Sequence, residues 1–225
     1  YTLYGNEIDR HYNKQTISCN SILVFDPDRK DTEKWVYSGG HRIDDDYSEE
    51  VMDAEDWKTK PSFNIGKVLY HDYKLEDGEL KYSCLCGDIT KAYDEETVSE
   101  VKRYMFSLHT GRADHPLAFF LFDRITANKE HFEKKVLLHM QTQPLVADTP
   151  NGKKCAMITN LDSRLYIQNA GSEVEYKLVG GENNQFNVKG VNYQKSRLEN
   201  PDAPFTFDFN VEEGWGRIEI SPEKP

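Results

Sequence analysis

The sequence lacks several features that define large classes of proteins. Its longest apolar run, at residues 117–122, has the length of a strand and is far shorter than the ~20 residues that cross a bilayer as a helix. It has no glycine-rich phosphate loop and no regular alternation of strand and helix signals, so a parallel α/β fold is not expected. Its four cysteines are too few for a disulfide scaffold.

Positive charge is also scarce. The chain has 28 lysines and arginines against 39 aspartates and glutamates, which gives a net charge of −11 at pH 7. Nucleic-acid binding needs clustered cations, so we expect no nucleic-acid partner. A polyanionic ligand would need a local basic groove. The chain starts at Tyr1 rather than at Met, and we take it to be a fragment or a processed chain.

Strand signals dominate what is present. The composition, with 37% hydrophobic and 30% charged residues, is that of a soluble globular protein. Strands are predicted at residues 136–141, 163–168, 173–179, 205–211 and 216–221, and the last three show the period of two of a half-buried strand. The run at 117–122 is apolar on both faces, which predicts a central strand between layers.

Turn and helix signals complete the expected fold. Asn151-Gly152 predicts a hairpin. The two helix candidates are short, at residues 49–57 and 94–103, the second with Asp94 as its cap. We therefore expect a mainly β protein built of antiparallel β-sandwich layers, with part of a central β-sandwich domain at residues 1–148 and a smaller C-terminal β domain at residues 149–225.

Several clusters of polar residues could carry chemistry, and each also has a structural explanation. His109, His115 and His139 could bind a metal, although hydrogen-bonded histidines at strand ends are the more frequent case. His11-Tyr12 could supply a general base and a phenol for proton abstraction. The evidence for each is a short spacing only, so these alternatives stay open.

Two further clusters point to metals more weakly. Cys84 and Cys86 are separated by one residue, whereas paired zinc ligands usually have two to four residues between them, so two buried thiols in a sheet are expected instead. Residues 44–46 are three aspartates that could bind calcium but lack the spacing of a helix-loop-helix site, which favours a solvated loop.

Cys19-Asn20 is the strongest single candidate. The segment of residues 16–27 reads as a strand on which Cys19 shares a face with Leu23 and Phe25. A thiol on a strand usually serves packing, but a thiolate is also a strong zinc ligand. Spacing alone does not decide between these two roles.

Several stretches, in order along the chain, resemble the heparinase II branch of the heparinase II/III polysaccharide lyases. They are His11–Ser21 followed by Leu23–Pro27, Gly39-Gly40-His41-Arg42, Gly87–Tyr93, Phe122–Ile125 with Lys134-Lys135 and Leu137–His139, and Val179–Gly181 with Phe186, Val188, Asn192-Tyr193 and Gly216–Pro222. Each match alone is short, and together they span nearly the whole chain.

The resemblance implies an enzyme with a helical toroid domain, a central β-layer domain and a C-terminal β domain, of which this chain carries the β part. It implies β-elimination on uronate-containing polysaccharide of the heparin/heparan sulfate type, by catalytic residues that lie upstream, so the chain alone is expected to be inactive. It also implies a zinc site in the β domain, and Cys19 stands where the family has a histidine ligand.

The resemblance further implies where substrate and partners belong. His41, Arg42 and Asn20 are the expected substrate-binding residues; Arg42 suits a carboxylate or sulfate, or it pairs with the acidic residues 44–46. The expected partners are an acidic polysaccharide and the toroid domain, with a possible homodimer and a periplasmic or secreted location. The rival hypothesis is a non-catalytic carbohydrate-binding or scaffold β module, in which Trp35, Trp57 and Trp215 are exposed.

Overall fold

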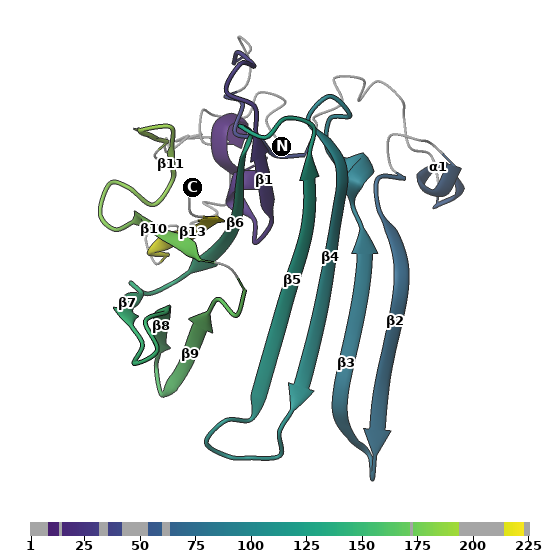
Figure 1. Cartoon of the computed structure of the whole chain (residues 1–225), viewed down its shortest axis with the longest axis vertical. Helices are drawn as coiled ribbons and strands as arrows, with labels where there is room; N and C mark the ends of the chain where they lie inside the picture. The colour runs from purple at the N-terminus through teal and green to yellow at the C-terminus, as the bar shows by residue number, and fades with distance from the viewer. Residues whose placement is uncertain are drawn as a thin grey trace, which may run out of the picture. The chain divides into compact units, whose positions relative to one another are not determined.

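The computed structural model divides the chain into two compact units. Unit 1 comprises Tyr1–Gly40 with Glu133–Pro225, and unit 2 comprises His41–Phe132. The structure describes residues 9–13, 15–31, 36–41, 54–59, 64–171, 173–193 and 214–222. Figure 1 labels α1 and most of the strands of both units.

Unit 1 is built on a four-stranded antiparallel sheet in the order β1-β6-β13-β10. Its strands are β1 (Ile22–Phe25), β6 (Glu133–Met140), β13 (Gly216–Pro222) and β10 (Val174–Gly180). Distant parts of the chain meet here, because β6 pairs with both β1 and β13, and in the second pair Ile218 faces Leu138 and Arg217 faces His139. β-branched residues at alternate positions of β13 explain the strand.

Short elements cover one face of this sheet. They are η1 (Asp9–Asn13), η2 (Thr16–Ser18) and the hairpin of β11 (Asn187–Val188) and β12 (Val191–Asn192). Their apolar side chains form one buried core with the sheet, comprising Tyr12, Ile17, Leu23, Leu137 and Val188. A three-stranded antiparallel sheet of β7 (Leu145–Asp148), β8 (Lys154–Asn160) and β9 (Ser163–Gln168) completes unit 1.

Two glycines allow β10 and β13 to approach at their ends. Gly180 pairs with Gly216 across the ladder. A Cβ atom on Gly180 would lie 2.2 Å from the Trp215 carbonyl oxygen, and one on Gly216 would lie 2.3 Å from the Val179 carbonyl oxygen. Gly216 also has a φ of 138°, which side-chain-bearing residues rarely adopt. No other residue therefore fits this close approach.

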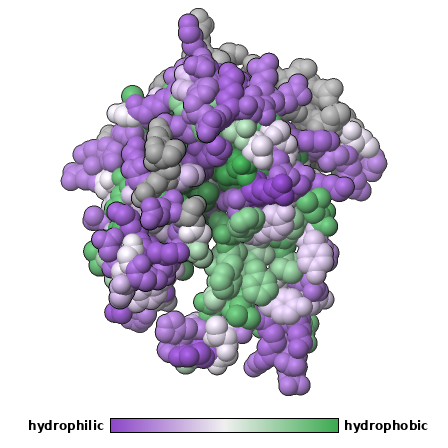
Figure 2. All heavy atoms as spheres, in the orientation of Figure 1, coloured by the Kyte–Doolittle hydropathy of each residue, from purple (hydrophilic) through white to green (hydrophobic). Residues whose placement is uncertain are grey.

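Unit 2 is a four-stranded antiparallel sheet of long strands in sequence order, β2 (Lys67–Glu76), β3 (Glu79–Asp88), β4 (Val98–His109) and β5 (Leu117–Ala127). Short helices flank it, α1 (Ala54–Thr59) and η3 (Thr90–Ala92). Many of its large apolar side chains are exposed, and Phe122 is 63% exposed. Figure 2 shows hydrophobic side chains gathered over these strands.

The expected fold class is confirmed, since the chain is mainly β with several antiparallel sheets of a β-sandwich-like kind. The strands expected at residues 136–141, 163–168, 173–179 and 216–221 correspond to β6, β9, β10 and β13, and Asn151-Gly152 lies in the turn between β7 and β8. The strand expected at residues 205–211 lies outside the described residues. The boundary expected after residue 148 falls in the same β7–β8 turn.

Two local predictions are wrong. Residues 94–103 are not a helix: Asp94 accepts a hydrogen bond from the Glu96 amide in a turn, and β4 starts at Val98, because its β-branched and aromatic residues pair with β3 and β5. The run at 117–122 is not central, because β5 is an edge strand of the described sheet. Among the described helices, none is long and apolar enough to cross a bilayer.

Candidate functional site

Cys19 and Asn20 lie in a bend rather than on a strand, which corrects the expectation for residues 16–27. Thr16–Ser18 forms a 3-10 turn, Cys19 caps it with its amide bonded to the Thr16 carbonyl, and β1 begins only at Ile22. The Cys19 side chain is exposed, with its Sγ 3.7 Å from the Ser18 hydroxyl. Cys19 is therefore not part of the hydrophobic core.

Asn20 holds this bend against the edge of β6. Its Oδ1 accepts a hydrogen bond from the His139 amide at 2.7 Å and lies 3.2 Å from the His139 Nδ1. The side chain thus continues the hydrogen bonds that β1 makes to β6, as the Ser21 carbonyl does for Leu137. The resemblance predicts that Asn20 binds substrate. In the fold, its side chain also links the bend to β6.

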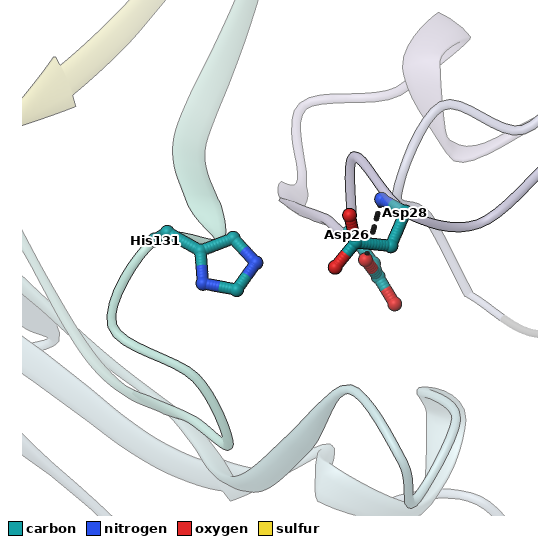
Figure 3. A group of neighbouring side chains, drawn as sticks. All are labelled: Asp26, Asp28 and His131. Carbon is teal, nitrogen blue, oxygen red and sulfur yellow. Dashed lines mark hydrogen bonds between the residues drawn. The ribbon is translucent and has the colours of Figure 1, made fainter.

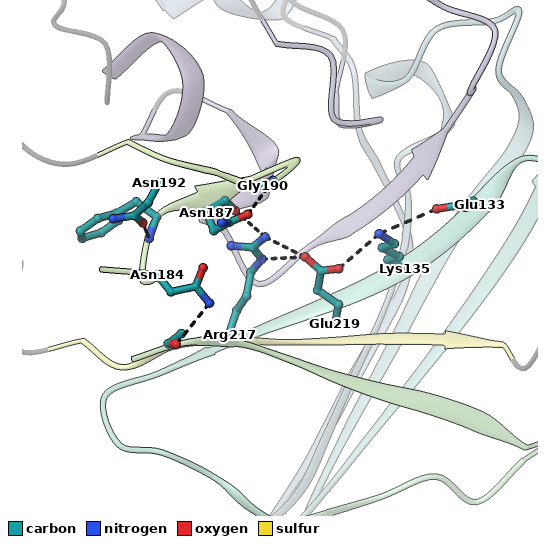
Figure 4. A network of polar contacts seen from close by, with 10 residues as sticks. Glu133, Lys135, Asn184, Asn187, Gly190, Asn192, Arg217 and Glu219 are labelled. Carbon is teal, nitrogen blue, oxygen red and sulfur yellow. Dashed lines mark hydrogen bonds and ion pairs between the residues drawn. The ribbon is translucent and has the colours of Figure 1, made fainter. Parts of the chain in front are cut away.

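A buried ion network lies behind this bend (Figure 4). Arg217 is 2% exposed and donates two hydrogen bonds, at 3.1 and 2.7 Å, to one carboxylate oxygen of Glu219. It also donates to the Asn187 carbonyl at 2.8 Å, while the other Glu219 oxygen lies 3.2 Å from the Lys135 ammonium. Burial raises the pKa of Glu219, but the charges of Arg217 and Lys135 lower it by more. The net pKa is below its ordinary value, so the carboxylate stays charged.

Tyr12 and His139 stand next to this network. The Tyr12 ring is edge-on to His139, with centroids 6.5 Å apart, and its hydroxyl lies beside the Arg217 guanidinium. Burial raises the pKa of Tyr12 despite the opposing charge of Arg217, so the phenol keeps its proton. Burial and the charge of Arg217 lower the pKa of His139 to about 4, so the imidazole is neutral at pH 7.

A half-open groove of about 340 Å³ lies beside Asn20 and His139. Its walls come from the end of β6 and the turn after it on one side and from the β8–β9 hairpin on the other. Aliphatic side chains such as Ile158 and Leu165 alternate with amides and hydroxyls such as Asn160 and Ser163. The groove therefore combines an apolar floor with neutral hydrogen-bonding groups, as small-molecule sites do.

The other two expected substrate residues, His41 and Arg42, belong to unit 2. His41 is the first residue of unit 2, edge-on to Tyr93 with centroids 4.8 Å apart. Burial, and then the charge of Arg103, lower the pKa of His41. Arg42 lies outside the described residues, and so do residues 44–46, with which it was expected to pair.

The described residues do not form a closed zinc site around Cys19. Among them, no pair of histidine, aspartate, glutamate or cysteine side chains gathers with Cys19 as three ligands would. Asp26 and Asp28 form a short turn, in which the Asp26 Oδ1 accepts the Asp28 amide at 2.9 Å (Figure 3). His131, drawn with them, belongs to unit 2, so the three groups are not a site of either unit.

The remaining chemical candidates have structural roles. The His11 Nδ1 accepts a hydrogen bond from the Val36 amide, and its ring lies tilted against that of Tyr193, with centroids 4.7 Å apart. His115 lies 3.0 Å from the carboxylate of Asp114 on an exposed turn. Cys84 and Cys86 are on one face of β3, both as free thiols, and Cys86 is buried.

Arg217, Glu219 and Lys135 were not predicted as site residues. The alternation in residues 216–221 predicted a strand whose polar face meets water, but η1 and the β11–β12 hairpin cover that face. An arginine and a glutamate two residues apart on one strand face, in a strand otherwise apolar, is the signal that could have indicated a buried pair.

Comparison with known proteins adds no assignment: no model of a known protein family matches the sequence, and no curated protein matches it significantly.

Proposed function

We propose that this chain is the C-terminal β region of a heparinase II/III-like lyase that cleaves uronate-containing polysaccharide of the heparin/heparan sulfate type by β-elimination. The residues that perform the elimination belong to the upstream part of such an enzyme. In this proposal the chain contributes the β layer that faces the polysaccharide, next to a helical toroid domain, in a periplasmic or secreted protein.

One observation carries the proposal: stretches that resemble the family, far apart in the sequence, meet in unit 1. Asn20 of the first stretch bonds to His139 of the fourth. Tyr12 of the first is edge-on to Phe186 of the last, with centroids 5.2 Å apart. Gly40 of the second touches Thr16, since a Cβ atom there would lie 2.5 Å from the threonine side chain.

The chemistry at this meeting point supports a role in binding rather than in bond cleavage. The groove beside His139 is open to a ligand, and the amides and hydroxyls of its lining suit hydrogen bonding to a sugar. Arg217, which is 2% exposed and donates to Glu219 and Asn187, does not line the groove.

Zinc at Cys19 is part of the proposal only with ligands from outside the described residues. A thiolate there would supply a negatively charged ligand in place of an imidazole. The exposed position of Cys19 at the end of η2 supports this, because a ligand must be reachable by groups from another segment.

The test is the activity of the full-length gene product on heparin, heparan sulfate, chondroitin and alginate, followed by the ultraviolet absorbance of the unsaturated uronate product. Zinc content is measured on the same sample, and on its Cys19→Ala variant. Absorbance growth on heparin or heparan sulfate is the expected result. A flat trace on all four polysaccharides, from a folded protein, would reject the proposal.

A second candidate is a non-catalytic carbohydrate-binding module, favoured by the aromatic face of unit 2. Aromatic rings line one face of its sheet, with centroids 5.6 Å apart for Tyr104 and Phe122 and 5.9 Å apart for Phe106 and Phe120. Exposed rings on a flat sheet offer stacking surfaces. Of the three tryptophans that first suggested this role, only the side chain of Trp215 is described, and it packs against Gly180.

The binding-module function predicts a different result when the same glycans are tested. Glycan binding that survives without lyase activity, and that falls when Phe122 is replaced by Ala, would support it. Lyase activity on one polysaccharide would favour the first function.

A further inference from the structure

The groove of unit 1 has a floor of aliphatic side chains. Ile158 pairs with Leu165 and Ala156 pairs with Ile167 across the β8–β9 ladder, so Ile158, Leu165 and Ile167 share one face of that hairpin. All three line the groove, with Leu138 and Met140 of β6 opposite. Leu165 is 56% exposed, which leaves apolar surface for a ligand to cover.

Neutral polar groups form its rim. Asn160 and Ser163 pair across the same ladder, on the face of the aliphatic floor. The Asn160 Nδ2 donates a hydrogen bond to the Gln141 Oε1 at 3.2 Å. This bond aligns two side-chain amides at the mouth, and it leaves the Asn160 Oδ1 and the Gln141 Nε2 without a partner among the described residues, one as an acceptor and the other as a donor.

The groove is not built for a strongly charged group. Its lining includes no aspartate, glutamate or lysine. Arg164, the one arginine that lines it, pairs with Thr159 in the ladder and so belongs to the hairpin face opposite to that of Asn160 and Ser163. A sulfate or carboxylate would lose hydration here with Arg164 as the one lysine or arginine in the lining.

We propose that this groove binds the acetamido group of an N-acetylated amino sugar in the polysaccharide. The methyl group covers the aliphatic floor, the amide N–H donates to the Asn160 Oδ1, and the carbonyl accepts from the Gln141 Nε2. A volume of about 340 Å³ is near the lower end of the ~300–1,000 Å³ of small-molecule sites and admits one sugar ring. The inference rests on the proposed function, which supplies the polysaccharide that contains this sugar.

The experiment measures binding by the chain itself, so that it does not depend on catalysis. Isothermal titration compares two hexasaccharides that alternate glucuronate with glucosamine, one N-acetylated and the other N-sulfated. The N-acetylated probe is expected to bind at least about tenfold more tightly, as expected for one apolar group in a fitting pocket. Equal binding, or tighter binding of the N-sulfated probe, would overturn the assignment.

Two matched variants place the binding in the groove. Leu165→Asp puts a carboxylate on the floor and should abolish the preference for the acetylated probe. Leu161→Asp makes the same change at a hairpin-tip residue that is 92% exposed and does not line the groove, so its binding should equal that of the parent chain. If circular dichroism shows that Leu165→Asp is unfolded, Asn160→Ala replaces it, with an expected loss of about fivefold.

The outcome is separable from the lyase assay. Lyase activity of the full-length product without a preference for the acetylated probe would overturn the groove assignment alone. A preference for the acetylated probe, lost in Leu165→Asp, together with no lyase activity would overturn the proposed lyase function and leave the acetamido site standing.

Discussion

The two four-stranded sheets differ in which side chains they bury. In the sheet of unit 1, Arg217 and Glu219 are buried under η1 and the β11–β12 hairpin. In the sheet of unit 2, large apolar residues such as Phe120 and Phe122 are more than half exposed. Alternation along a strand therefore identifies the strand, but the elements laid over each face decide which residues leave water.

The largest difference between the units is expected at their ion pairs. Arg217→Met leaves Glu219 buried without its main partner, which should lower the free energy of unfolding by about 3–5 kcal/mol. In unit 2, Arg103 pairs with Asp123 at 2.7 Å but keeps 15% of its side-chain surface exposed, so Arg103→Met should cost less. Urea unfolding measures both changes. Equal costs would mean that burial does not separate the two pairs.

A double variant serves as the control for this prediction. Arg217→Met with Glu219→Leu removes both charges and should recover most of the loss, because it leaves no buried charge unpaired.

The second-largest difference between the units is expected for the truncation of apolar side chains. Leu137 is fully buried in the core of unit 1, and Leu137→Ala should cost about 2–5 kcal/mol of unfolding free energy through lost burial and a cavity. Phe122 is 63% exposed, so Phe122→Ala should lower the unfolding free energy by less than about 1 kcal/mol, although it removes more atoms than Leu137→Ala does. Thermal and urea unfolding measure both. A Phe122→Ala cost as large as that of Leu137→Ala would show that another part of the molecule covers this face.

Acid should act on unit 1 through His139. Its pKa is about 4 in the folded chain, below the ordinary 6.5 of the unfolded chain, so the folded state disfavours the proton. The stabilisation from the neutral imidazole is therefore complete above pH 6.5 and is lost as the pH falls through 4. After allowance for its partial exposure, we expect a loss of no more than about 2 kcal/mol.

The matched variant is His139→Gln, which keeps a polar side chain and removes the titration. Its unfolding free energy should fall less between pH 6.5 and 4 than that of the parent chain. The pKa of Glu219 is lowered from 4.5, so protonation of Glu219 still reduces the unfolding free energy of both proteins at lower pH, because it breaks the pairs with Arg217 and Lys135. An unchanged pH profile in His139→Gln would assign the acid sensitivity to other groups.

The smallest expected difference concerns single hydrogen bonds. Asn20→Ala removes the acceptor of the His139 amide and should lower the unfolding free energy by about 1 kcal/mol. Ser107→Ala in unit 2 removes a part-buried hydroxyl pair with Ser83 at 2.7 Å and should cost about half as much, because the remaining Ser83 hydroxyl can rotate to another partner whereas a backbone amide cannot. Amide hydrogen exchange at His139 should rise in Asn20→Ala alone.

The predictions from sequence succeeded where the signal was local. Alternation located β10 and β13, and Asn151-Gly152 located the β7–β8 turn. They failed where tertiary pairing decided the outcome. Residues 98–103 joined a sheet in spite of the acidic, cap-like start at Asp94, and Cys19 lies before β1 because it ends the turn η2. Of the candidate residues named from the sequence, Asn20 and His139 line the groove, and their contact spans 119 positions.

The sequence by itself determined the fold class, most of the described strands and the acidic character, because strand period and turn chemistry are properties of neighbouring residues. Only the tertiary structure decided that Arg217 and Glu219 are buried and that Asn20, His139 and the β8–β9 hairpin border one groove. The physical reason is that burial depends on which distant element covers a strand face, and a period of two residues is the same whichever face is covered.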